Sequence, residues 1–230
     1  MKAGTAGRIR AGAAAGITGP ALFTGAWVVS SFRQTGHPVA SLQISGLAAA
    51  DARDPWIMIT GFLVLGGCTV VFGDALHDAL GRAGPGPRLI QGAGILTIAA
   101  GLLHRDHLLL TSGSVSWHNH AHDVISAVIY SDLVLAQLML AVRFGRDGVR
   151  AGVRAGEGRR RPARPEPLSW ARWRPWLVGS AVATAATLIA FAVDTSGPAA
   201  GILQRVAVSI PLTVITAIAA RLLRTPGTGR

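Results

Sequence analysis

The chain has 230 residues, of which half are hydrophobic and only 14% are charged, and its mean hydropathy is +0.43. These values exclude an ordinary soluble enzyme, because the apolar residues fall in long blocks with almost no charge. The single cysteine, Cys68, excludes an intramolecular disulfide. The composition therefore predicts an integral membrane protein and leaves the redox compartment open.

In chain order, the apolar blocks predict six membrane-spanning helices and an all-α fold. A helix needs about 20 residues to cross the hydrocarbon core, and most of the blocks reach that length. The predicted spans are about 11–32, 56–76, 89–104, 121–144, 176–193 and 202–223. The whole chain, residues 1–230, then forms a single membrane domain.

The formal net charge of +11 comes mainly from one connection between spans. Between Arg143 and Arg174 there are ten arginines and only three carboxylates, together with several glycines and prolines. Such a segment cannot bury a core, so residues 145–175 are predicted to form a basic, solvated loop. Basic loops beside membrane spans bind anionic lipid headgroups, and this partner is favoured here over nucleic acid.

The distribution of positive charge also predicts the orientation of the chain. If the six spans alternate in direction, eighteen Lys and Arg residues fall on one side and four on the other. The side that is not translocated keeps the positive charge, so both termini are predicted to be cytoplasmic. We expect a multi-pass protein of the inner (plasma) membrane, with an oligomeric state that the sequence leaves open.

Most of the histidines fall on the predicted outer side, where nearly every span end also carries an ionisable group. The densest segment is Trp-His-Asn-His-Ala-His-Asp, residues 117–123. His118 and His122 are four residues apart, so a helix would project both from one face, with Asp123 beside them. With Asp106 from the end of span three, these residues could bind zinc.

Three other interpretations of the polar residues stay open. The outer histidines and carboxylates could cap helix ends, or neutralise Arg205 in a buried polar lock that fixes the order of the helices. A transporter would need polar groups near the middle of the membrane, where only Asp132 and its neighbours Tyr130 and Ser131 are expected. Haem is disfavoured, because no histidines face one another in the middle of two spans.

Four short motifs, in this order, resemble those of the bacterial domain of unknown function 998 family. They are His-Pro-Val-Ala-Ser-Leu at 37–42, Ala-Gly-Leu-Leu-His-Arg-Asp at 100–106, the histidine segment at 117–123, and Gly-Ile-Leu-Gln-Arg at 201–205. The family positions that match are His37, Pro38, Ser41, Asp106, His118, His122, Asp123, Gln204 and Arg205. This chain has His104-Arg105 where relatives often have Pro-Thr, and His120 is additional.

The resemblance implies a six-helix bundle with no established activity, and it places the matched polar residues in one extracytoplasmic pocket. We therefore expect a structural or ligand-binding pocket formed by His37, Ser41, Asp106, Gln204 and Arg205. A first alternative is a zinc-dependent membrane hydrolase of lipid-like substrates with His118, His122, Asp123 and Asp106 as ligands. A second alternative is a small transporter. Whether the chain is an enzyme is left open at this point.

Overall fold

The protein is almost entirely helical. The computed structural model describes residues 3–82, 84–109, 114–156 and 170–224, and all statements about the structure refer to these ranges. They form six α-helices and two short 3-10 helices, without a strand. In chain order these are α1 (Ala3–Arg33), η1 (Ser45–Ala48), α2 (Pro55–Ala79), α3 (Gly86–Leu102), α4 (Trp117–Gly156), η2 (Trp170–Trp173), α5 (Arg174–Val193) and α6 (Ala200–Arg224).

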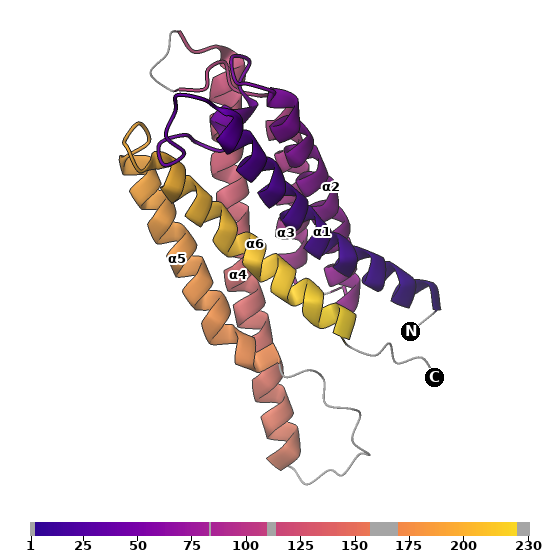
Figure 1. Cartoon of the computed structure of the whole chain (residues 1–230). Coiled ribbons are helices and arrows are strands. Elements are labelled where there is room, and N and C mark those ends of the chain that lie inside the picture. Colours follow the sequence, from indigo (N-terminus) through magenta and orange to yellow (C-terminus); the bar gives the residue numbers. More distant parts are fainter. Residues whose placement is uncertain (1–2, 83, 110–113, 157–169, 225–230) are drawn as a thin grey trace.

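The contacts between the six α-helices close into a ring, and Figure 1 shows this bundle from the side. Each helix packs against the next one in the chain, and α6 returns to pack against α1, whereas α4 and α6 barely touch. Segments 34–54, 103–109 and 194–199 lie at the end that is uppermost in Figure 1, which we call the upper end. The two described ends of the chain lie toward the opposite, lower end.

Five of the six helices are long and apolar enough to cross a membrane, namely α1, α2, α4, the η2–α5 segment and α6. Helix α3 has 17 residues, which corresponds to about 25 Å at 1.5 Å per residue. Many large apolar side chains point outward from the ring, such as Phe32, which is 78% exposed, and Val193, which is 84% exposed. Such a surface suits a lipid environment rather than water.

The helices cover the six predicted blocks, but their ends differ from the expected ones. The largest difference is at α4, which continues through Gly156 into the segment that was expected to be a loop. Arginine is a good helix former, and no proline occurs in this part of the chain before Pro162. The central part of the predicted basic loop, residues 157–169, lies outside the described residues.

Small residues bring neighbouring helices into close contact. Helices α2 and α3 meet at Gly66 and Gly94, and a Cβ atom on Gly66 would lie 2.6 Å from the carbonyl oxygen of Gly94. A side chain at this position would therefore push the two helices apart, as expected where glycines mediate packing in a membrane. The interior of the ring contains large apolar side chains, including Phe23, Phe72 and Phe144.

Candidate binding site

Two side chains in the first turns of α6, those of Gln204 and Arg205, hold the segment after α1 against the bundle through hydrogen bonds. Arg205 donates from Nη1 to the carbonyl oxygen of Leu42 at 2.5 Å and from Nη2 to Oγ of Ser31 at 2.7 Å. Gln204 accepts a hydrogen bond from the backbone N–H of Ile44, with an N···O distance of 2.5 Å. Both side chains are buried, and these hydrogen bonds compensate for part of the cost of removing them from water.

A second polar network crosses the upper end through Arg105, which follows α3. Arg105 donates from Nη1 to Gln43 and from Nη2 to Asp123 on α4, both at 2.7 Å. Gln43 donates in turn to the carbonyl oxygen of Thr195, between α5 and α6, at 2.6 Å. The Arg105 side chain is only 6% exposed, whereas that of Asp123 is 45% exposed. The carboxylate is therefore the accessible part of this ion pair.

Asp106 ties together the two ends of the segment that joins α3 to α4. Its carboxylate accepts from the backbone N–H of Ser116 at 2.6 Å and from the Ser116 hydroxyl at 2.8 Å. These two hydrogen bonds lower the pKa of Asp106 below its ordinary value, because they stabilise the ionised form. Ser41 donates to the nearby carbonyl oxygen of Pro38, and His37 is exposed. Of the five expected pocket residues, only Gln204 and Arg205 thus act on the same segment.

The two histidines expected on one face of α4 lie at different depths. His118 is exposed, and its ring stacks on Trp117 with a centroid distance of 3.8 Å. His122 is 1% exposed, and its Nδ1 lies 2.9 Å from the carbonyl oxygens of both Ala100 and Leu103. The reason is that His118 is in the first turn of α4, beyond the point where α3 ends, so α3 does not cover it.

The expected zinc ligands have separate surroundings. Asp123 is paired with Arg105, Asp106 is bound to Ser116, and the two histidines face different neighbours. Among the described residues, no three His, Cys, Asp or Glu side chains are grouped so that they could hold a metal ion. The geometry therefore gives a zinc centre no preformed set of ligands in this part of the chain.

A groove of about 700 Å³ lies between α4 and α5; we call it the lateral groove. One end is polar and includes Gln43, Arg105, Asp123 and Thr195. The rest is mainly apolar and is lined by Ala127, Val134, Leu135, Ala185, Leu188, Ile189, Phe191 and Ala192, together with the polar residues Ser45, Ser126, Tyr130, Ser131 and Gln204. An apolar groove with polar groups at one end suits a ligand that has an apolar chain and a polar headgroup, that is, an amphiphile.

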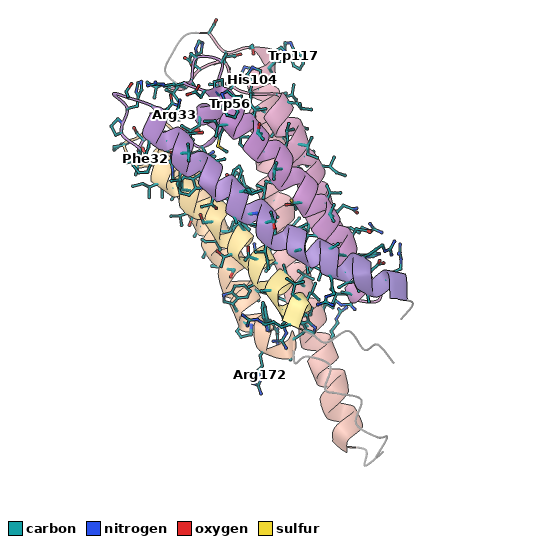
Figure 2. The ribbon with its side chains drawn as sticks, turned by 45° about the vertical axis from the view of Figure 1, so that its right-hand side comes forward. Phe32, Arg33, Trp56, His104, Trp117 and Arg172 are labelled. Atoms are coloured by element: carbon teal, nitrogen blue, oxygen red, sulfur yellow. The ribbon has the colours of Figure 1, made fainter. Side chains whose placement is uncertain are left out.

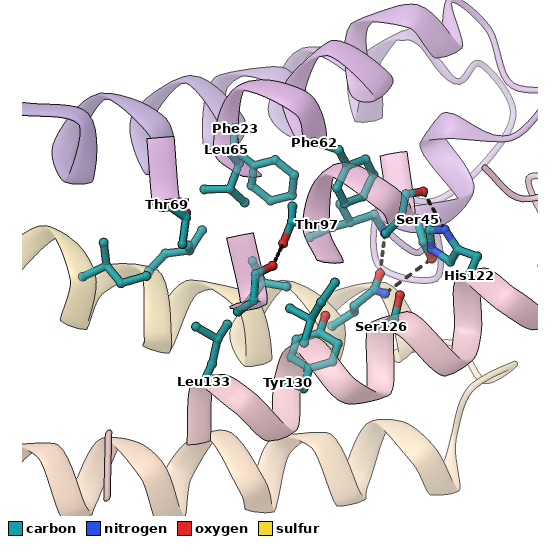
Figure 3. A pocket seen from close by; sticks show the side chains of 18 residues that line it. Phe23, Ser45, Phe62, Leu65, Thr69, Thr97, His122, Ser126, Tyr130 and Leu133 are labelled. Carbon is teal, nitrogen blue, oxygen red and sulfur yellow. Dashed lines mark hydrogen bonds between the residues drawn. The ribbon is translucent and has the colours of Figure 1, made fainter. Parts of the chain in front are cut away.

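A second space, the inner cavity, lies inside the ring and measures about 70 Å³ (Figure 3). Phe23, Phe62, Leu65 and Leu133 contribute to its apolar walls. Its polar lining consists of Ser45, Thr69, Thr97, His122, Ser126, Tyr130 and Gln204. No Asp, Glu, Lys or Arg side chain from the described residues lines this cavity.

Several residues that build this end of the protein have no distinctive signal in the sequence. Gln43 and Ser31 are isolated polar residues beside a span, which are common at helix ends. Arg105 departs from the family pattern, yet it joins two connecting segments to α4. A glycine is required at position 201, where the segment after α1 passes close to α6, because a Cβ there would collide with the carbonyl oxygen of Leu42. Gly201 is the glycine of the Gly-x-x-Gln-Arg motif.

The apolar, outward-facing helices and the polar connections at their ends define a multi-pass α-helical membrane protein. The chain belongs to the family described as "Protein of unknown function (DUF998)", which matches residues 17–221 and thus extends from within α1 to within α6. No curated protein and no solved structure matches the chain.

Proposed function

We propose that this protein binds a membrane amphiphile in the lateral groove, with the apolar chain between α4 and α5. The observation that carries this function is the polarity of the groove, which has the Arg105–Asp123 ion pair at one end and apolar side chains along its length. Asp123 is six residues after exposed Trp117, about 9 Å along the helix. A tryptophan at a helix end favours the headgroup region, so the polar end of the groove would meet the headgroup of a lipid.

The charges at this end favour a headgroup without net negative charge. Arg105 and Asp123 neutralise each other, and Asp123 is the more accessible partner. Its carboxylate can accept hydrogen bonds but repels anions. The bound amphiphile therefore carries hydrogen-bond donors, such as hydroxyl groups, in a neutral or zwitterionic headgroup.

The proposed orientation of the protein in the membrane is based on the positive charge at the two ends of the bundle. Among the described residues, the upper end carries Arg33, Arg53, Arg105 and Arg205, whereas most other arginines belong to the lower end; Figure 2 labels Arg33 and Arg172 at the two ends. We propose that six helices span the plasma membrane, that the lower end and both termini are cytoplasmic, and that anionic headgroups contact the lower end. The lateral groove then opens toward the outer leaflet.

Metal-dependent hydrolysis and transport are not part of the proposed function. Hydrolysis would require the four expected ligands to converge, and they have separate partners. Transport would be supported by a charged group on a path through the bundle, but Asp132 lines neither the lateral groove nor the inner cavity, although its neighbour Tyr130 lines both. Binding of an amphiphile needs only the groove itself.

The test is native mass spectrometry of the full-length protein released from a mild detergent. We expect the wild-type protein to retain one amphiphile, and the Ala185→Trp variant to lose it, because the indole would fill the apolar part of the groove. Ala186 is the neighbouring residue on α5, is exposed and does not line the groove. Ala186→Trp is therefore the control and should retain the amphiphile.

Ala127→Trp provides a second way to fill the groove, because Ala127 lines it from α4 and is exposed. Loss of the amphiphile from both groove variants, but not from the control, would support the proposed function. A wild-type protein without a bound amphiphile, or equal retention by all variants, would overturn it.

A further inference from the structure

The lateral groove and the inner cavity share part of their lining. Ser45 from η1, Ser126 and Tyr130 from α4, and Gln204 from α6 line both spaces. All four side chains are polar. Because they line both spaces, the surface that the two spaces share is polar.

His122 presents an unused hydrogen-bond acceptor at the inner cavity. The carbonyl oxygens of Ala100 and Leu103 can only accept, so the proton of the neutral imidazole must reside on Nδ1. Nε2 then carries a lone pair, and it is buried without a hydrogen-bond partner. The His122 ring lines the inner cavity and meets Phe62 edge to face, with the ring centroids 6.3 Å apart. A buried acceptor without a donor is unfavourable, so a group that supplies one is stabilised there.

We propose that the headgroup of the bound amphiphile enters the inner cavity and donates a hydroxyl hydrogen bond to Nε2 of His122. This inference rests on the proposed function and specifies the class of ligand. His122 and Asp123 are consecutive on α4, yet the first lines the inner cavity and the second lines the lateral groove. A headgroup with two hydroxyl groups can therefore donate to both acceptors while its chain lies between α4 and α5.

The size and charge of the inner cavity favour a small neutral polyol. A water-sized group needs roughly 10–15 Å³ of such space, so a cavity of about 70 Å³ admits a few such groups but no acyl chain. An ammonium group would find no carboxylate among the residues that line this cavity, and burial of an unpaired charge is costly. The glycerol headgroup of a monoacylglycerol meets these requirements.

The experiment compares two probes with the same acyl chain, monooleoylglycerol and methyl oleate, by native mass spectrometry of the full-length protein. Only the first probe has hydroxyl groups. We expect the wild-type protein to bind monooleoylglycerol more tightly, with the buried hydrogen bond to His122 contributing about tenfold to the ratio of the two affinities. Equal binding of the two probes would overturn the inference.

A matched pair of variants assigns the preference to His122. In His122→Asn, the side-chain amide can still donate to the carbonyl oxygens of Ala100 and Leu103, but no atom remains at the position of Nε2. We expect this variant to lose about tenfold of the preference and to keep only the part that Asp123 supplies, whereas His118→Asn, on the exposed histidine one turn earlier, should keep the full preference. A preference for monooleoylglycerol that is unchanged in His122→Asn would overturn the inference.

A spectroscopic measurement on the wild-type protein does not depend on how well these variants fold. With ¹⁵N-labelled histidine, the His122 Nε2 resonance should shift when monooleoylglycerol is added and should stay unchanged with methyl oleate. No shift with bound monooleoylglycerol would overturn the inference. Failure of both probes to bind would instead overturn the proposed function, and binding of both without discrimination would leave intact only the binding of an amphiphile in the lateral groove.

Discussion

At the scale of single residues, the upper end is held by polar groups whose partners are mostly backbone atoms. Arg205 donates to carbonyl oxygens and a serine hydroxyl rather than to a carboxylate. Asp51 and Asp106 each accept from a backbone N–H in the segment between α3 and α4, at Leu108 and Ser116. Because these side chains fix the connecting segments, substituting them should loosen those segments while the helices stay packed together.

The Asp106 hydrogen bonds should give local stability that depends on pH. The pKa of Asp106 is lower in the folded protein than in the unfolded chain, so its stabilisation is fully present above the ordinary aspartate pKa of about 3.9. It is lost as the pH falls through the lowered pKa. Asp106→Ala should therefore accelerate hydrogen exchange of the Ser116 amide at neutral pH, and this difference from wild type should shrink in acid.

The control for this exchange experiment is Asp51→Ala. Asp51 accepts from the backbone N–H of Leu108, at 2.5 Å, so this variant should expose the Leu108 amide and leave Ser116 protected. A Ser116 difference that persists unchanged in strong acid, or that is absent at neutral pH, would contradict the assigned role of Asp106.

Parts of this site could be predicted from sequence, and the reasons for the rest are physical. Gln204 and Arg205 are predicted from the Gly-Ile-Leu-Gln-Arg motif that resembles the family pattern. Their partners Leu42 and Ile44 cannot be predicted, since they contribute backbone atoms that carry no side-chain signal. The different depths of His118 and His122 are not predicted either, because helical spacing gives the face of a residue but not how far its neighbouring helix extends.

At the scale of the helices, the apolar blocks indicate where each helix lies, but not how far it continues beyond its apolar stretch. Helix α4 begins at Trp117, before the apolar stretch 121–144, and continues to Gly156, because histidine and arginine are compatible with a helix when tertiary contacts or length support it. The length of α3, 17 residues, does not by itself show whether this helix crosses the membrane. Its close packing on α2 at Gly66 and Gly94 places it within the ring.

If α3 crosses the membrane, the segments at its two ends lie on opposite sides. In a Cys68→Ser background, which removes the single natural thiol, Ser114→Cys should react with a membrane-impermeant maleimide in intact cells. Pro85→Cys, at the other end of α3, should react only after permeabilisation. Both positions are exposed in the protein, so equal labelling of the two in intact cells would exclude the six-span arrangement.

At the scale of the whole molecule, the two ends differ in charge. Arg146 and Arg172 are exposed at the lower end, and Arg33 and Arg53 are exposed at the upper end near Asp54. An arginine close to an anionic membrane surface contributes about 1 kcal/mol to binding. The excess of arginines should therefore make lipid association at the lower end electrostatic and sensitive to salt.

We expect Arg146→Gln/Arg172→Gln to reduce the enrichment of phosphatidylglycerol around the purified protein on the order of tenfold. The lipid that copurifies from bilayers of mixed composition can be measured by mass spectrometry. The matched double variant Arg33→Gln/Arg53→Gln removes the same charge from the upper end and should leave the enrichment close to wild type. Equal losses in the two double variants would contradict the proposed asymmetry.

The length of α4 limits which arginines can take part. Its 40 residues extend about 60 Å, whereas a bilayer with its headgroups is about 40–45 Å thick. Figure 1 shows the lower part of α4 continuing past the other five helices. At physiological ionic strength electrostatic attraction decays over about 8 Å, so the attraction of a charged membrane surface does not reach the lower tip of α4. Under the proposed orientation this tip lies in the aqueous phase beyond the headgroups, and anionic lipid contacts only the part of the protein beside the bundle.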